Sequence, residues 1–320
     1  MSRTYHIDGT QEFGYSTVNR YLYSYYSFTN TVKRVCELYN NASVHDLNGY
    51  AAHFCYRRVK AFHTFTKIVV EHKDYITSNC VLRMLGDSVS VFHLVYMEKN
   101  PHYRWLRHAL YVLEGCEKNM EVLRGGDFNK EAMPEEEFEI FKQQLNFNVE
   151  LRKRLMFEAQ QIIDTSPLKL QDEAAFKKIV KDRNWKFKEF KNYKNIKENQ
   201  YSWHELYEKI GRCEHFDLLT YISQYVHALS MSNLVMEMNV QNRDGLIAEA
   251  LGLINKLNDD VLLFFSMNYP YIMDGFLAPD MRDKILSCYD DEHRPDLSSW
   301  ETRISNCKKA YYDNGRMERI

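Results

Sequence analysis

Glycine and proline are scarce in this chain of 320 residues, which contains 12 glycines and 6 prolines. Both residues interrupt regular structure, and here they fall between long periodic segments. No segment shows the strict alternation of apolar and polar residues that a half-buried strand requires. The sequence therefore predicts an all-α protein, and a chain of this length can bury a sizeable core.

Long hydrophobic runs are also missing. No run reaches the roughly 18 apolar residues of a membrane span, so we expect none. The first residues, MSRTYHIDGTQEFGY, lack the apolar core of a signal peptide. The charges of the 42 basic and 44 acidic residues nearly cancel. The net charge therefore gives no strong electrostatic attraction to nucleic acid or to a membrane. We expect a cytoplasmic protein.

The common metal and nucleotide motifs are absent as well. The seven cysteines form no CxxC pair, which favours buried, reduced thiols over a zinc ribbon or a redox dithiol. HExxH, GxxxxGK[ST], GxGxxG and GxSxG do not occur. The sequence predicts no metal site and no cofactor.

What the sequence does contain is a series of helical patterns that together predict a multi-helix bundle with long antiparallel helices. We expect the main bundle over residues 1–240, with an irregular lysine- and aromatic-rich connector at 166–200. Residues 241–320 are expected to form a peripheral C-terminal helical part packed on the same domain. The predicted helices span about 15–41, 51–75, 78–98, 101–124, 135–164, 202–211, 216–238 and 245–268.

Two of these helices are nearly free of charge. Between Asp74 and Glu98 the only charged residues are Arg83 and Asp87, four apart and so on one helical face. Their neighbours are mostly apolar, which predicts a helix surrounded by others. A buried charge is tolerable only when it is paired, so replacing Asp87 with Ala is expected to leave Arg83 buried and unpaired, at a cost of about 3–5 kcal/mol.

The second such helix contains no charged residue from Leu218 to Met236, yet it carries a seam of polar side chains. At about 100° per residue the seam lies on one side of the helix, and it consists of Thr220, Ser223, His227 and Ser230. The economical arrangement sets Arg83 and Asp87 against Ser223 and His227. We therefore predict that the two helices pack together around this cluster.

Three segments resemble an uncharacterised bacterial helical family, domain of unknown function 5677. They are VLRMLGDSVSVFHLVYMEKNP, WLRHALYVLEGCEKNMEVL and YEKIGRCEHFDLLTYISQYVHALS, and the resemblance covers roughly residues 50–235. The family pattern has Leu-Arg followed four residues later by an acid, and a serine ahead of a Val-His pair. Its matching positions here are Leu82, Arg83, Asp87, Ser223 and His227. The family has no established activity.

A more distant likeness is to HEPN domains, helical bundles many of which are metal-independent ribonucleases in toxin and anti-phage systems. This likeness implies a catalytic role for the same cluster. His227 would be the general acid/base, Arg83 would stabilise the charge on phosphorus, and Asp87 would orient Arg83. The alternative is a non-catalytic helical binding or scaffold protein in which the cluster, Ser223 included, only fixes helix register.

The segment FKKIVKDRNWKFKEFKNYKNIKENQ (176–200) interleaves nine basic residues with aromatic ones. Lysines that contact phosphates and rings that stack on bases are typical of single-stranded RNA binding. The alternative is a solvated connector whose aromatic side chains anchor it to the bundle. RNA, a protein partner or a second copy of the chain are the partners considered. The nucleic-acid-binding candidates are Arg183, Trp185, Lys186, Lys188, Lys191, Tyr193 and Lys194.

Overall fold

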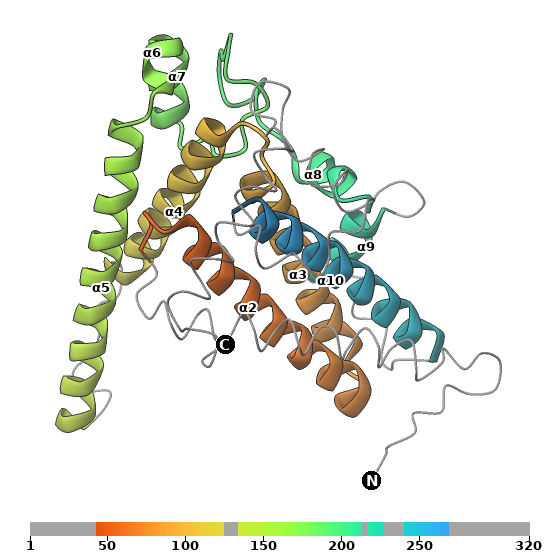
Figure 1. The fold of residues 1–320 in the computed structure, drawn as a ribbon. Coiled ribbons are helices and arrows are strands. Elements are labelled where there is room, and N and C mark those ends of the chain that lie inside the picture. Colours follow the sequence, from red (N-terminus) through yellow and green to blue (C-terminus); the bar gives the residue numbers. More distant parts are fainter. Residues whose placement is uncertain (1–42, 125–133, 213–216, 227–239, 269–320) are drawn as a thin grey trace, which may run out of the picture. The chain divides into compact units, whose positions relative to one another are not determined.

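The computed structural model describes residues 43–124, 134–212, 217–226 and 240–268, and Figure 1 shows these segments in colour. Their regular structure is helical, apart from an isolated bridge between Phe187 and Gln200, so the predicted all-α class is confirmed. The elements are α2 (Leu47–Lys67), the π-helical turn η1 (Ile68–His72), α3 (Tyr75–Tyr96), α4 (Pro101–Arg124), α5 (Glu135–Asp164), α6 (Leu168–Gln171), α7 (Glu173–Lys181), α8 (Trp203–Lys209), α9 (Leu218–Val226) and α10 (Val240–Asn268).

These segments form two compact units. Unit 1 contains residues 51–97 and the described residues from 202 onward, and unit 2 contains residues 43–50 and 98–201. The helix predicted at 15–41 lies outside the described residues. The predicted boundary near residue 240 stays a prediction, because the chain on either side of α10 is also outside them.

Unit 1 is built around α3, which packs against α8, α9 and α10. Most α3 side chains are buried, as its nearly charge-free sequence predicts. Aromatic rings fill the space beside it. Phe54 of α2 packs on Phe92 of α3, and Phe264 of α10 meets the rings of Phe92 and Tyr96 edge-on. Such pairs add about 0.5–1.5 kcal/mol to the free energy of area burial.

The start of α3 differs from the prediction. The helix begins at Tyr75 rather than near residue 78, because Asp74 acts as its N-cap and its side chain accepts a hydrogen bond from the Thr77 backbone at 3.0 Å. Hydrogen bonds from Thr77 hold the pKa of the Asp74 carboxyl below its usual range. The preceding turn η1 ends at His72, and its C-cap Lys73 has a left-handed backbone with φ of 52°.

Unit 2 contains a two-helix arm formed by α4 and α5, with the boundaries that the sequence predicts. The helices are antiparallel, because Arg152 of α5 donates to Asn119 near the end of α4. At the other end of the arm, His102 and Ile162 line one pocket. Figure 1 shows the two helices side by side.

Segment 166–200 is more regular than predicted, since α6 and α7 occupy its first half. Its second half is held by Arg107 of α4, a buried side chain whose guanidinium carbon lies 3.9 Å from the centroid of the Phe187 ring. Arg107 donates to the Glu98 carboxylate at 3.1 Å and to the Trp185 carbonyl at 3.0 Å. The guanidinium thus fixes an irregular segment onto a helix.

His108 is a second buried polar residue of unit 2. Its Nε2–H donates to the carbonyl oxygen of Val44 at 3.1 Å, and the ring meets those of Tyr50 and Trp105 edge-on. Burial lowers the pKa of His108 to about 4. The imidazole is therefore neutral in the folded protein at physiological pH.

Unit 2 is expected to lose stability as the pH falls from about 6.5 towards 4. In the unfolded chain the imidazole takes up a proton near pH 6.5, whereas in the folded chain it stays neutral until about pH 4. The neutral side chain makes its full contribution to the free energy of unfolding above pH 6.5. Below pH 6.5 this free energy decreases by up to about 3 kcal/mol. Between pH 7 and pH 4.5 the Tm of the wild-type protein should decrease more than the Tm of His108→Gln. The glutamine amide can donate the same hydrogen bond but takes up no proton in this range. Equal decreases in both proteins would contradict this assignment.

Candidate functional site

The predicted pair on α3 is formed. Arg83 Nε donates to Asp87 Oδ1 at 2.8 Å, and the side chains are 16% and 30% exposed. The pair is thus partly buried rather than sealed. The cost of 3–5 kcal/mol for removing Asp87 applies to a fully buried arginine, so we expect a smaller loss, about 1.5–3 kcal/mol, as for a hydrogen bond to a charged group.

Ser223 of α9 joins this pair, as predicted. Arg83 Nη1 donates to Ser223 Oγ, and the Ser223 hydroxyl donates to the Leu219 carbonyl one turn earlier at 2.6 Å. The structure thereby brings together three of the four predicted cluster residues from helices far apart in sequence. The fourth, His227, lies outside the described residues, one position after the end of α9.

Tyr207 of α8 is a member of the cluster that the sequence analysis missed. Its hydroxyl donates to Asp87 Oδ1 at 3.1 Å and lies 3.4 Å from the Arg83 carbonyl oxygen. This approach requires Gly86, because a Cβ there would lie 2.2 Å from the Tyr207 oxygen. A lone glycine inside a long apolar helix often marks such a close contact. It was the one available signal for this residue.

α8 places two aromatic rings beside the Arg83 guanidinium. The ring centroids of Trp203 and Tyr207 lie 6.0 and 5.8 Å from its central carbon. The start of α8 is fixed by a capping box, in which Ser202 and Glu205 satisfy each other's backbone N–H groups. The guanidinium is attracted to the faces of such rings. Side chains of α3, α8 and α9 together therefore fix its orientation.

One edge of this guanidinium remains available. Nε and Nη1 have partners, while Nη2 has no hydrogen-bond partner among the described residues. Arginine presents its donors as a rigid fork that matches phosphate and carboxylate oxygens. The partly exposed Arg83 can therefore bind an anion without giving up Asp87 or Ser223.

The aromatic candidates of segment 176–200 are placed differently from the prediction. Trp185 and Tyr193 are buried, so neither ring offers a face on which a base could stack. The Trp185 indole donates to Glu114, and the Tyr193 hydroxyl donates to Asp182 at 2.9 Å. Burial raises the pKa of Tyr193 to about 12. The base-stacking role is wrong for these two residues, because their rings belong to the core of unit 2.

The basic candidates of this segment lie nearer the surface. Arg183 forms a two-pronged ion pair with Glu117, with Nη2 2.8 Å from Oε1. Three of the four lysine ammonium groups lie over rings or beside an acid. Lys186 is over the Trp185 ring, Lys188 is over the Tyr201 ring, Lys194 is 3.9 Å from Glu198, and Lys191 is exposed. Their role in binding RNA stays a prediction.

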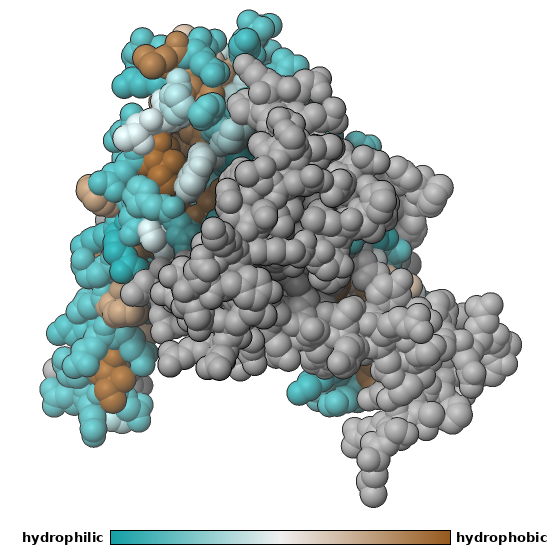
Figure 2. All heavy atoms as spheres, in the orientation of Figure 1, coloured by the Kyte–Doolittle hydropathy of each residue, from teal (hydrophilic) through white to brown (hydrophobic). Residues whose placement is uncertain are grey.

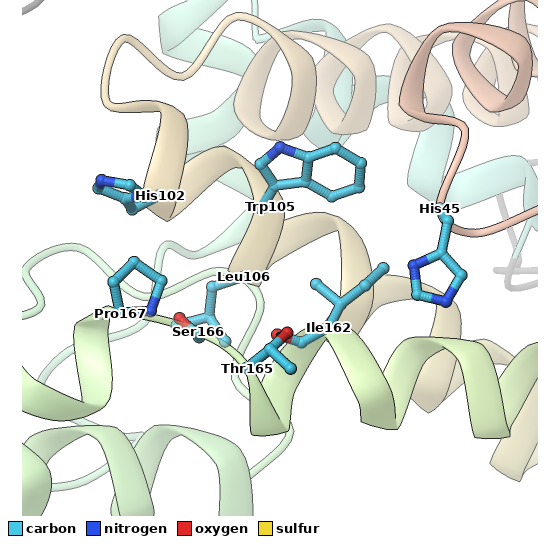
Figure 3. Close-up of a pocket in the computed structure, with 8 residues that line it drawn as sticks. All are labelled: His45, His102, Trp105, Leu106, Ile162, Thr165, Ser166 and Pro167. Carbon is cyan, nitrogen blue, oxygen red and sulfur yellow. The ribbon is translucent and has the colours of Figure 1, made fainter.

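Unit 2 also contains an open pocket of about 350 Å³ between the start of α4 and the end of α5. Figure 3 shows His102 and His45 at opposite ends, with Trp105 on one side and Ile162 on the other. Asp, Glu, Lys and Arg are absent from its lining. The α4 amides cannot bind an anion there, because Asn100 already accepts from the backbone N–H groups of His102 and Tyr103. The Arg83 cluster is therefore the stronger candidate site.

The contact between Gly86 and Tyr207 can be tested with a matched pair of substitutions. Gly86→Ala places a methyl group against the Tyr207 hydroxyl and should destabilise the protein by about 1–3 kcal/mol, as other overpacked sites do. Gly115→Ala on α4 has open space around it and should instead stabilise the helix by about 0.5–1 kcal/mol. Urea unfolding of both variants measures the difference. A neutral or stabilising Gly86→Ala would show that Tyr207 does not lie against α3.

Comparisons with family models, with curated proteins and with solved structures give no match to this chain. In the described part of the chain, no group of three metal-binding side chains is placed to hold an ion. None of the described helices has the length and apolar character needed to cross a membrane. The side chains around Arg83 are therefore the observation that bears on function.

Proposed function

We propose that the protein is a cytoplasmic, metal-independent ribonuclease of the HEPN-like type, acting in a toxin or anti-phage system. One observation supports this most directly. Arg83 is held by Asp87 and Ser223, and its Nη2 has no hydrogen-bond partner among the described residues, which suits an anionic phosphodiester. The cluster is also partly exposed, so a substrate can reach it.

The chemistry assigned to the cluster is transfer of the phosphodiester to the neighbouring ribose hydroxyl. The 2′-oxygen gives its proton to a base and bonds to phosphorus, while the bond to the 5′-oxygen breaks and that oxygen receives a proton. In the proposal His227 is the acid/base, and Arg83 stabilises the charge that develops on phosphorus. Asp87 orients Arg83, and Ser223 holds its second donor.

The experiment is cleavage of a labelled single-stranded RNA by the full chain in the presence of EDTA. His227→Ala should reduce the rate about 10²–10⁴-fold, because general acid–base catalysis contributes that much. Arg83→Ala should reduce it at least about 10²-fold, because its guanidinium stabilises developing charge. Arg212→Ala is the matched control, since Arg212 is also a partly buried arginine paired to an acid, Glu249, in the same unit. It should leave cleavage unchanged.

Absence of cleavage by the wild-type protein would remove the ribonuclease proposal. So would cleavage that survives both cluster substitutions. A requirement for a divalent ion would contradict the metal-independent mechanism. Cleavage lost equally in Arg212→Ala would trace the effect to folding rather than to the cluster.

A second candidate function is a non-catalytic helical binding or scaffold protein. It is favoured by the fact that Arg83, Asp87, Ser223 and Tyr207 connect α3, α8 and α9 of one unit to each other. Buried polar networks of this kind fix which helices pack together. Under this function, Arg83→Ala changes the Tm and the wild-type protein leaves RNA intact.

A further inference from the structure

The exposed apolar residues of α5 are dispersed over a hydrophilic surface. Along the edge of the molecule where Figure 1 labels α5, Figure 2 shows brown residues separated by teal ones. Single exposed apolar side chains are common on protein surfaces and do not by themselves mark a partner. Among the described residues of unit 1, a histidine held by a buried carboxylate is the more informative feature.

This histidine is His93 of α3, and the carboxylate is that of Asp260 on α10, the helix that packs beside α3 (Figure 1). Nδ1 of His93 lies 2.9 Å from Oδ2 of Asp260, whose side chain is only 1% exposed. A carboxylate only accepts hydrogen bonds, so the imidazole Nδ1–H donates. The neutral ring then carries its lone pair on Nε2. Asp260 thereby fixes both the tautomer and the direction of the ring.

The second ring nitrogen of His93, Nε2, is open to solvent. The His93 side chain is 28% exposed, although the carboxylate that holds its Nδ1 is sealed. Nε2 has no hydrogen-bond partner in the part of the chain that the structure describes, and it is not one of the buried side-chain atoms that lack a partner there. His93 thus presents an oriented, nucleophilic lone pair to solvent.

Lys256 of α10 supplies a positive charge beside this ring. Its Nζ donates to Oδ1 of Asp260 at 2.7 Å, so it binds the second oxygen of the carboxylate that holds His93. The ammonium has further donors to offer. The acid next in sequence, Asp259, lies about 100° round the helix from Asp260. The residues of α3 about one turn from His93 carry no charge: Val89, Ser90, Tyr96 and Met97. A nucleophile beside a cation suits an anionic electrophile, and a phosphoryl group is one.

We propose that His93 is a phosphoryl-accepting site, which takes the group on Nε2 from a small donor such as an acyl phosphate or a phosphoramidate. The Nε2 lone pair bonds to phosphorus, while the bond from phosphorus to the leaving group breaks and its electron pair departs with that group. The ring becomes a cation that keeps its Nδ1 proton, and the Asp260 carboxylate stabilises it. Lys256 neutralises charge on the phosphoryl oxygens. This inference does not depend on the ribonuclease proposal, in which His93 has no part.

Labelling of the full chain with a limiting amount of phosphoramidate tests the site. Mass spectrometry identifies the modified residue, and NMR identifies the modified nitrogen. His93 should be labelled first, on Nε2. His204 of α8 is the internal control, because it is more exposed, at 50%, but lies between two acids. Its Nδ1 is 3.3 Å from Glu208 and its Nε2 is 3.8 Å from Asp217. These carboxylates repel an anionic donor, so His204 should react about tenfold more slowly.

Substitutions around the ring separate the chemistry from packing. His93→Gln should remove this label. Lys256→Gln, whose amide can still donate to Asp260, should slow the labelling of His93 about tenfold, because a charge-assisted hydrogen bond to the phosphoryl oxygens is lost. Lys256→Arg should restore the rate. Asp260→Asn no longer fixes Nδ1 as the donor, so the label should then appear on both ring nitrogens. The Tm of each variant checks that it is folded.

A wild-type protein in which His93 stays unlabelled would overturn the proposal, and so would labelling of His204 at the same rate or faster. A label on Nδ1 of the wild-type ring would contradict the orientation set by Asp260. If Lys256→Gln and Lys256→Arg left the rate equally changed or equally unchanged, the positive charge would have no role at the phosphoryl group, and the proposal would fail as well.

Discussion

The ion pair between Arg83 and Asp87 is the interaction on which the arrangement of unit 1 depends. α3 is buried on most sides, so two charges on it are tolerable only if their donors and acceptors find partners nearby. Asp87 accepts from Arg83 and from Tyr207, and Arg83 reaches Ser223. These bonds fix α8 and α9 on α3 at defined positions, which apolar contacts alone specify less sharply.

Part of this could be predicted from the sequence, because it follows from charge and helical periodicity alone. Two charges four residues apart in an apolar helix have to pair, and a polar seam in a second charge-free helix supplies the nearest partners. The convergence of Arg83, Asp87 and Ser223 follows from that requirement. Tyr207 could not be found in this way, since a tyrosine hydroxyl pairs with residues at any sequence distance. Only the absence of a side chain at Gly86 indicated that something approached α3 there.

For the lysine- and aromatic-rich segment, composition alone does not predict what the aromatic rings contact. Alternating lysines and rings are expected both for an RNA-binding surface and for an irregular segment that anchors itself by its aromatic side chains. The choice depends on which way the rings point, and that is set by Arg107. Its guanidinium binds the Trp185 carbonyl and lies over the Phe187 ring. An irregular segment has no helical or strand periodicity, so the direction of its aromatic rings cannot be predicted from its sequence.

Arg107 and Arg83 make a useful contrast, because both are arginines held by an acid beside aromatic rings. The Arg107 side chain is 3% exposed, and its partners are backbone and side chain of its own unit. A ligand can reach it only by displacing the segment that it anchors. Arg83 has the same kind of support, yet it keeps some exposure, and its Nη2 has no partner in the part of the chain that the structure describes. An arginine whose guanidinium is oriented by fixed partners and accessible at one edge can bind an incoming anion without reorganising. The difference between the two residues thus lies in access to solvent, and access is what makes Arg83 the candidate for chemistry.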